Sequence, residues 1–405
     1  MPKVRKAVFN ALLLVYREEG FLAEHLDQWK RRAHPSDRDF SLAFEMAMGT
    51  VRKTWTLDYI AKQLSNTGKL SLKLKEKVLV RMSIYQAVFM NSLPIYAIGD
   101  QMVSLAKELC HVRFASFLNV LIHKLDGFKW TLPEDLSARY SFSPYFIEKL
   151  INDYGQEKAI EVMEALDTIH PPMMRVRTGE NTHQTIIQTK MGPVVQLALK
   201  EPLASWGQNP NVYIQNATPV YLLDQLMDGL DGPPDAILDL CAAPGGKTLA
   251  LHDAFPAAEL FANEKSPRRK ATLEQNLAKY GVTTTLSSED GTTFHSPRHF
   301  DLIVLDVPCS NSGVLGKKPE ARLRQTKDHI EQLTHLQKAL LKHAKRFLKK
   351  NGQIWYLTCS ILKSENQDII EASGYRVVSD PITVLPSKEG WDGGFACALK
   401  LSENV

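Results

Sequence analysis

The segment after Pro233-Pro234 constrains the fold most strongly, because short apolar runs alternate there with stretches of helical periodicity. We predict helices near 247 to 255, 267 to 280 and 328 to 350. Between them we predict strands near 236 to 240, 258 to 263, 283 to 287, 301 to 306 and 353 to 358. This βαβ order is typical of an α/β domain built on a doubly wound sheet.

Two cysteines stand just beyond two of these apolar runs. Cys309 follows the run 302 to 306, and Cys359 follows the run 354 to 358. The ends of parallel strands are where open α/β sheets do their chemistry. If the two strands are neighbours, backbones about 4.8 Å apart bring both thiols to one sheet edge. Two thiols without metal-like spacing suggest nucleophilic chemistry on a small planar substrate.

Composition limits the class of protein. A length of 405 residues is typical of two or three domains with substantial cores. The five cysteines are odd in number, scattered and without a CxxC pair, so we expect no disulfide framework and no metal site. We therefore expect reduced thiols and a cytoplasmic location. No run of eighteen apolar residues is present, so we expect no membrane span. A net charge of +4 permits a nucleic-acid partner without proving one.

The rest of the chain predicts two further domains. From residue 5 to about 125 the pattern is helical, with a capping signal at Ser36 and an apolar stripe of Val8, Ala11, Leu12 and Val15. Pro144 is placed to open a helix that runs to about 166, and short apolar runs follow Pro171-Pro172. We predict an all-α domain over 1–130, a small α+β linker domain over 131–232 and an α/β domain over 233–405.

The first strand of the α/β domain leads into the turn Ile-Leu-Asp-Leu-Cys-Ala-Ala-Pro-Gly-Gly-Lys-Thr, residues 237 to 248. Gly245 and Gly246 allow backbone amides to approach a ligand, and the helix N-terminus that follows favours a negative or electron-rich group. The end of this turn also matches a P-loop, and the run closing in Asp306 resembles the acidic strand that holds magnesium in such ATPases. The first glycine of a P-loop would fall at Cys241, however, which makes that interpretation the weaker one. A tight turn without a ligand is the third interpretation.

Four ordered motifs resemble one known family. They are the turn just described, Asp-Val-Pro-Cys-Ser-Asn-Ser-Gly-Val from 306, Lys-Lys-Pro-Glu from 317 and Leu-Thr-Cys-Ser-Ile from 357. Together they look like the Sun/Fmu (Nol/Nop/Sun) family of RNA cytosine-5 methyltransferases. Three further stretches, 37–40, 49–52 and 117–121, resemble a NusB-like RNA-binding domain. The combination is similar to family members that methylate 16S ribosomal RNA, so we expect a monomeric enzyme whose partner is ribosomal RNA.

The resemblance implies a Rossmann-like domain that binds S-adenosylmethionine. Glu264 would accept hydrogen bonds from the ribose hydroxyls, and Asp290 would lie near the adenine amino group. The alternative for Glu264 is a solvated residue at a strand end, and for Asp290 a turn aspartate before Gly291. Asp306 is also expected beside the cofactor. The methionine part would be wrapped by Cys241, Ala242, Ala243, Pro244, Gly245, Gly246 and Lys247.

The family's chemistry implies roles for three residues. Cys359 would add to carbon 6 of cytosine, which makes carbon 5 nucleophilic toward the activated methyl group. Asp306 would hydrogen-bond the ring nitrogen. Cys309 would assist removal of the carbon-5 proton and release of the product. The alternative for any single cysteine is a small buried hydrophobe, which we expect for Cys110 and Cys397.

Substrate binding must expose the target base, because a stacked cytosine cannot reach a thiol at a sheet edge. The segment 310 to 327 has little periodicity and suits a loop that closes over a phosphate backbone through Lys317, Lys318, Arg322, Arg324 and Lys327. A solvated charged loop is the alternative. A second basic set fits a solvated helix face as well as an RNA contact: Lys338, Lys342, Lys345, Arg346, Lys349 and Lys350.

Three places depart from the family pattern. Asn216 stands where an aspartate is usual, Arg177 replaces a common asparagine, and Asn311-Ser312 replaces Gly-Thr. These changes affect substrate detail and not the reaction. Two other functions stay open. A P-loop-like nucleotide-hydrolysing protein would need Lys247 for phosphate, whereas a non-catalytic NusB-like RNA-binding factor would leave the two thiols without a purpose.

Overall fold

The computed structural model describes residues 2–17, 20–65, 68, 70–90, 93–179, 182–199, 201 and 203–402. The chain divides into two compact units. Unit 1 comprises 1–159 together with 315–326, and unit 2 comprises 160–314 together with 327–405. The predicted three-domain division is finer than this and stays a prediction.

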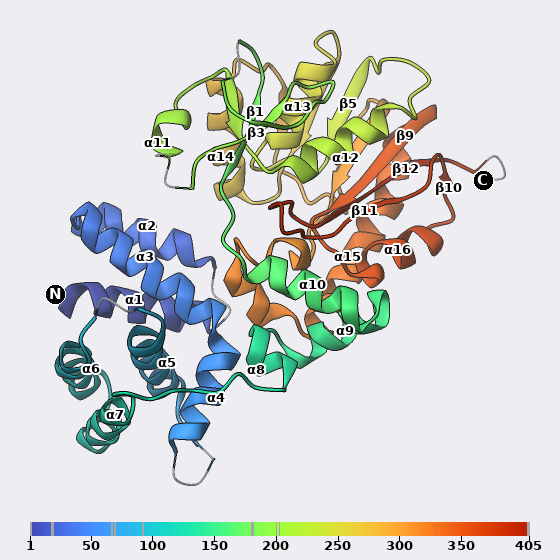
Figure 1. Cartoon of the computed structure of the whole chain (residues 1–405). Helices are drawn as coiled ribbons and strands as arrows, with labels where there is room; N and C mark the ends of the chain where they lie inside the picture. The colour runs from blue at the N-terminus through green and yellow to red at the C-terminus, as the bar shows by residue number, and fades with distance from the viewer. Residues whose placement is uncertain are drawn as a thin grey trace. The chain divides into compact units, whose positions relative to one another are not determined.

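The first part of unit 1 is a set of helices around one apolar core (Figure 1). The predicted stripe of Val8, Ala11, Leu12 and Val15 is buried in this core. Ser36 caps its helix as predicted, because its hydroxyl accepts a hydrogen bond from the Asp39 amide at 3.1 Å. The helices are α1 (Pro2–Val15), α2 (Leu22–Ala33), α3 (Asp37–Arg52), α4 (Thr54–Leu64), α5 (Leu74–Phe89), α6 (Ile95–Leu109) and α7 (Val112–Lys124).

Three shorter helices follow, α8 (Leu136–Tyr140), α9 (Pro144–Tyr154) and α10 (Gln156–Asp167). Pro144 opens α9 as predicted, with Ser143 as the N-cap. The prediction of one helix running to about 166 is wrong, because Gly155 adopts a φ of 82° and separates α9 from α10.

The segment 315–326 belongs to unit 1, although it follows the Cys309 motif in the sequence. It contains the short helix η2 (Pro319–Arg324). Arg322 is fully buried, donates a hydrogen bond to the Arg52 carbonyl at 3.0 Å and lies 4.1 Å from the centroid of the Phe142 ring. The prediction that Arg322 faces a phosphate backbone is therefore wrong. Main-chain carbonyls and an aromatic face take up this guanidinium instead.

Unit 2 begins with a small antiparallel sheet in the order β2-β3-β1-β4. Its elements are β1 (Met173–Val176), β2 (Thr185–Ile187), β3 (Val194–Gln196), α11 (Leu203–Trp206) and β4 (Val212–Ile214). The mixed α+β character predicted for this region is confirmed. Arg177, just after β1, forms a two-bond ion pair with Asp253 at 2.7 and 2.8 Å.

The large sheet of unit 2 has the order β10-β12-β9-β8-β5-β6-β7, with β11 paired to β12. The strands β5 to β9 pair in parallel, which confirms the predicted doubly wound arrangement. The elements up to the fourth parallel strand are α12 (Ala217–Met227), β5 (Ala236–Asp239), α13 (Gly246–Ala254), β6 (Glu259–Asn263), α14 (Pro267–Lys279), β7 (Thr285–Ser287) and β8 (Phe300–Asp306).

Side chains of β8 alternate between the two faces of the sheet. Leu302 and Val304 pack in one apolar cluster with residues of α12, α13 and α14. Ile303 and Leu305 pack in another cluster with residues of α15 (Lys327–Ala344) and α16 (Gln367–Glu371). Helices thus cover both faces (Figure 1). A continuous apolar run is what a strand buried on both faces requires.

The C-terminal part differs from the predicted pattern. Helix α15 ends at Ala344, so Lys349 and Lys350 lie in β9 (Leu348–Thr358) and not on a helix face. Three antiparallel strands that were not predicted complete this edge, β10 (Arg376–Val377), β11 (Ile382–Val384) and β12 (Gly394–Lys400). Short 3-10 helices lie at η1 (Ser312–Val314), η3 (Lys345–Phe347) and η4 (Lys363–Glu365).

Candidate active site

Two thiols meet at the carboxyl edge of the large sheet. The parallel strands β8 and β9 are neighbours, and Asp306 is paired in register with Leu357. Cys309 follows β8 and Cys359 follows β9, and their Sγ atoms lie 3.1 Å apart. The predicted approach of the two thiols is therefore confirmed. Their closeness allows both to act on one planar ring.

Burial distinguishes the two cysteines. Cys309 is buried, whereas Cys359 is partly exposed. The hydrogen bond with Cys359 raises the pKa of the Cys309 thiol well above its usual value, and burial adds to this effect. Cys309 therefore holds its proton at neutral pH, whereas Cys359 is the more exposed of the two thiols.

An ion pair lies beside the thiols. Lys247, in the first turn of α13, donates to Asp306 at the end of β8, with 2.6 Å between Nζ and Oδ2. Burial lowers the pKa of Lys247, but Asp306 and the charge of Cys359 more than compensate, so the pKa lies above its usual value. Lys247 thus stays charged, and its ammonium group interacts electrostatically with Cys359.

A pocket of about 430 Å³ opens at the same edge of the sheet. Three predicted cofactor residues line it, Cys241, Glu264 and Asp290. Its walls also include the apolar side chains of Leu240, Pro308, Leu336 and Leu340. Apolar walls suit a purine ring and carboxylates suit hydroxyl and amino donors, so these residues fit the adenosine part of S-adenosylmethionine.

The two carboxylates of the pocket are held in different ways. Glu264 is buried, and its Oε1 accepts a hydrogen bond from the Ser266 amide at 2.9 Å. Asp290 accepts hydrogen bonds from Lys265 at 2.6 Å and from the Thr292 hydroxyl at 2.7 Å. The bond from Lys265 and then those from Thr292 lower the pKa of Asp290 to about 2, so this side chain is a carboxylate at neutral pH. Asp290 is thus both a turn aspartate and a pocket residue.

The turn that follows β5 is shaped mainly by contacts within the protein. Gly245 has a φ of 107°, and a Cβ at this position would lie 2.9 Å from a Leu273 methyl group. A Cβ at Gly246 would lie 2.9 Å from the Tyr213 ring. Ala242 and Ala243 are buried, and the Ala243 and Pro244 carbonyls accept hydrogen bonds from α14. The roles of 241–247 toward the methionine part of the cofactor stay a prediction.

Sequence reasoning gave no site role to four residues of this edge, one of which, Asn311, it noted only as a departure from the family pattern. Asp239 is buried beside Thr248, whose hydroxyl donates to it at 2.7 Å. Arg269 lies 3.5 Å from Glu264. Asn311 Oδ1 lies 3.5 Å from Cys359 Sγ, and Glu365 binds the residues next to both cysteines. Asp239 could have been singled out, because it lies in the Leu-Asp-Leu motif before the turn. The other three residues act through tertiary contacts that no local sequence pattern shows.

Asn216, one of the departures from the family pattern, does not line the described pocket. It caps α12 by accepting a hydrogen bond from the Thr218 amide at 3.2 Å. Its side chain also donates to the Gly390 carbonyl at 2.8 Å and accepts from the Asp392 amide at 2.9 Å. An asparagine supplies both the donor and the acceptor that these contacts need.

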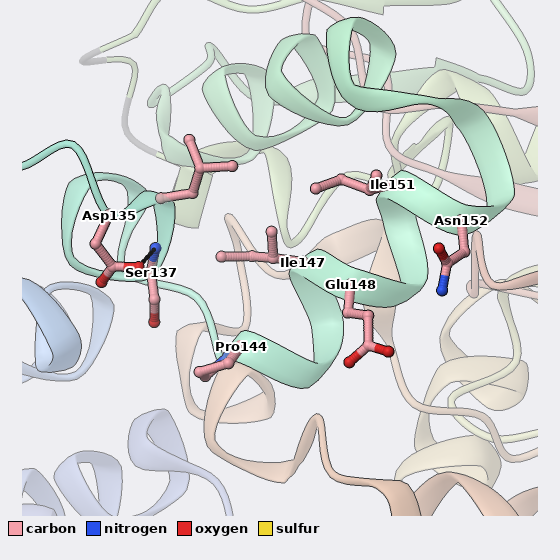
Figure 2. A pocket seen from close by; sticks show the side chains of 8 residues that line it. Asp135, Ser137, Pro144, Ile147, Glu148, Ile151 and Asn152 are labelled. Carbon is pink, nitrogen blue, oxygen red and sulfur yellow. Dashed lines mark hydrogen bonds between the residues drawn. The ribbon is translucent and has the colours of Figure 1, made fainter.

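A second hollow, of about 340 Å³, lies in unit 1 beside α8 and α9. Figure 2 shows Ile147 and Ile151 of α9 on one side of it and Asp135 and Ser137 on the other. The Asp135 carboxylate is already used, because it caps α8 by accepting from the Ala138 amide at 3.0 Å. None of the predicted site residues lines this hollow, and we assign it no chemistry.

Two further properties concern the part of the chain that the structure describes. Within the residues that the structure describes, no group of three or more His, Cys, Asp or Glu side chains is arranged to hold a metal ion. Nor does any helix in the described part of the chain have the length and apolar character needed to cross a membrane.

The fold and the pocket at its carboxyl edge define an S-adenosylmethionine-dependent methyltransferase. Residues 231–399 match the model of the family described as 16S rRNA methyltransferase RsmB/F, and residues 2–126 match the NusB family. The chain therefore combines a methyltransferase domain of the RsmB/F family with a NusB-family domain, and it is an enzyme. This finding sets aside both the nucleotide-hydrolysing and the non-catalytic alternative.

The chain is also similar in sequence to individual proteins named as ribosomal RNA methyltransferases. The chain is 27% identical over 452 residues to the probable ribosomal RNA small subunit methyltransferase B of Bacillus subtilis, covering 98% of each protein. It is 30% identical over 267 residues to the 28S rRNA (cytosine-C(5))-methyltransferase of Mus musculus, covering 59% of this chain and 33% of that protein.

Two solved structures share the fold. The crystal structure of PH0851 has a TM-score of 0.79 and 19% identity, covering 99% of both chains. NSun6 from Pyrococcus horikoshii with SFG has a TM-score of 0.52 and 18% identity, covering 64% of this chain and 98% of that one.

Proposed function

We propose that this chain methylates carbon 5 of a cytosine in 16S ribosomal RNA through a covalent bond between Cys359 and carbon 6. The observation that carries the proposal is the pair of Sγ atoms 3.1 Å apart beside the ion pair of Lys247 and Asp306. The names of the relatives support the substrate, since the Bacillus protein is named for the small subunit and the mouse protein for cytosine C5.

The first step belongs to Cys359 and Asp306. The Cys359 thiolate, favoured by the charge of Lys247, forms a bond from Sγ to carbon 6 of the ring. The Asp306 carboxylate takes up the proton that leaves Cys359. As the electrons of the ring's double bond move toward carbon 5, Asp306 passes this proton to the ring nitrogen that shares the developing charge. Glu264 and Asp290 would hold S-adenosylmethionine, which would supply an electrophilic methyl group. Carbon 5 would take up this methyl group as its bond to sulfur breaks, and S-adenosylhomocysteine would leave.

The second step belongs to Cys309. Its pKa is raised first of all by Cys359 and further by burial and by Glu365, and only the first of these causes disappears once Cys359 Sγ is bonded to carbon 6. Cys309 can then lose its proton to solvent and accept the proton of carbon 5. The electrons of that C–H bond restore the double bond, the bond between Sγ and carbon 6 breaks, and Cys359 leaves as a thiolate. The ring nitrogen returns its proton to Asp306.

RNA binding is assigned to the NusB-family domain, and both thiols must be reduced, which is consistent with a cytoplasmic reaction. The test is transfer of a labelled methyl group to purified 16S ribosomal RNA, followed by bisulfite sequencing. We expect one cytosine of 16S RNA to resist deamination by bisulfite, as a 5-methylcytosine does. Transfer to another RNA, or to another atom of the base, would contradict this substrate.

A further inference from the structure

A buried carboxylate connects the loops that carry the two cysteines. Glu365 lies at the end of η4 with no exposed surface. Its Oε1 accepts hydrogen bonds from the Ser310 amide at 2.8 Å and from Gln337 Nε2 at 3.0 Å. Its Oε2 accepts from the Ser310 hydroxyl at 2.5 Å and from the Ser360 hydroxyl at 2.6 Å.

The partners of this carboxylate are the immediate neighbours of the reactive groups. Ser310 follows Cys309, and Ser360 follows Cys359. One side chain therefore fixes a residue next to each thiol, although the two cysteines come from different strands. The Sγ atoms of the two cysteines that precede these serines lie 3.1 Å apart.

Main-chain amides set the direction of the serine hydrogen bonds. The Ser312 hydroxyl oxygen accepts from the Ile361 amide at 2.9 Å, so its proton is free for Ser360 Oγ, 2.8 Å away. The Ser360 oxygen also accepts from the Leu362 amide at 3.1 Å, which leaves its own proton for Glu365. The chain of donors thus ends on the carboxylate, and hydrogen bonds linked in this way strengthen one another.

We propose that Glu365 is a positioning residue that holds Cys309 and Cys359 at their working separation. The proposal rests on the two-thiol reaction proposed above. Taking a carboxylate out of water is costly, and four donors aimed at both oxygens offset that cost. An arrangement that only stabilised the fold would not need to join the two residues that follow the two cysteines.

The test compares wild-type protein with Glu365→Gln. The amide has one acceptor oxygen and an NH2 group that donates, so it cannot accept from all four partners. Diamide is added to the full-length protein without RNA. The two thiols lose two protons and two electrons, diamide takes them up and becomes the hydrazine, and an S–S bond forms. Peptide mass mapping then gives the rate at which Cys309 and Cys359 become linked.

Glu365→Gln removes a charge that raises the pKa of Cys309, which by itself would favour the reactive thiolate. We nevertheless expect the loss of positioning to prevail, slowing this linkage about tenfold or more and lowering kcat for methylation by about a hundredfold. The Kd for S-adenosylhomocysteine should stay unchanged, because Glu365 does not line the described cofactor pocket. Ser360→Ala removes only the contact on the Cys359 side, and we expect a smaller effect in the same direction. It also provides the measurement if Glu365→Gln does not fold.

Asp301→Asn is the matched control. Asp301 lies near the opposite end of β8, where it accepts from the Ala236 amide at 3.0 Å and from Lys349 at 2.8 Å. The Asp301→Asn variant should have a lower Tm than wild type, but Cys309 and Cys359 should become linked at the wild-type rate. Wild-type linkage rates in both Glu365→Gln and Ser360→Ala would overturn the proposal, whatever their activity. A second outcome separates the two proposals. If linkage is slow in the variants but wild-type protein forms no RNA adduct, the positioning role is supported and the proposed reaction is refuted.

Discussion

The ammonium of Lys247 lies 2.6 Å from the carboxylate of Asp306. One comes from the start of α13 and the other from the end of β8. The pair therefore forms only when the turn after the first parallel strand is folded against the fourth. The pair places the charged ammonium group of Lys247 beside Cys359. It also places a carboxylate, Asp306, where it can hydrogen-bond the target cytosine.

The pocket carboxylate Glu264 gives the first prediction. Glu264→Gln should weaken S-adenosylhomocysteine binding by about tenfold to a hundredfold, because hydrogen bonds from hydroxyls to a carboxylate are stronger than those to an amide. Glu259→Gln, at the exposed start of β6, the strand that Glu264 follows, should leave the Kd unchanged. Calorimetry on both variants measures this. Equal affinities would remove Glu264 from the cofactor site.

Asp239 gives a prediction about pH. Burial raises its pKa to about 7, and the hydrogen bond from Thr248 opposes this shift. The folded state therefore binds the proton more tightly than the unfolded state, where the pKa is about 3.9. The resulting stabilisation is complete below pH 4 and is lost as the pH rises to about 7, a change on the order of 4 kcal/mol.

Urea unfolding of wild type and Asp239→Asn at pH 5 and pH 8 tests this window. The variant has no titrating group at this position, so the stability of wild type relative to it should fall as the pH rises. A difference that does not change with pH would show that Asp239 titrates normally in the folded protein.

Asn311 should tune the nucleophile. Its φ of 58° is a left-handed conformation that glycine adopts freely, so Asn311→Gly should be tolerated. Its Nδ2 donates to the Cys309 carbonyl at 3.1 Å, which directs Oδ1 toward Cys359 Sγ as an acceptor. Removing that acceptor should raise the rate of Cys359 alkylation by iodoacetamide at pH 7 about threefold to tenfold. Asn311→Asp should lower it, and equal rates in all three proteins would exclude the contact.

The basic end of α2 offers a test of RNA binding by the helical domain. Lys30, Arg31 and Arg32 are exposed in its last turn. Changing all three to glutamate should weaken 16S RNA binding and reduce the slope of log K against log salt by roughly 2. S-adenosylhomocysteine binding is the control and should not change. If the slope of log K against log salt does not change, the RNA does not contact this end of α2.

The sequence predicted the main features of the catalytic edge because its signals are local. A buried parallel strand needs a continuous apolar run, so the ends of β8 and β9, and with them Cys309 and Cys359, could be located from the pattern. The end of α15 could not, because η3 and the start of β9 follow it with no glycine or proline between 327 and 351.

Long-range contacts account for the residues that sequence reasoning misjudged or missed. Arg322 sits in a stretch of charges typical of a solvated loop, yet tertiary contacts with Arg52 and Phe142 bury it. Glu365 is 55 positions from Ser310, and nothing in the local sequence shows that their side chains meet. Contacts of this kind depend on the completed fold.

The most direct measurement of the central claim is the formation of a covalent complex with RNA. Wild type, Cys359→Ala, Cys309→Ala and the buried control Cys397→Ala are each incubated with 16S RNA and S-adenosylmethionine and then separated under denaturing conditions. Cys359→Ala should form no complex and transfer no methyl group. Cys309→Ala should accumulate methylated RNA attached to Cys359 as a slowly migrating band, because the group that assists release is missing. A trapped band from Cys359→Ala and none from Cys309→Ala would reverse the two roles and contradict the proposed mechanism.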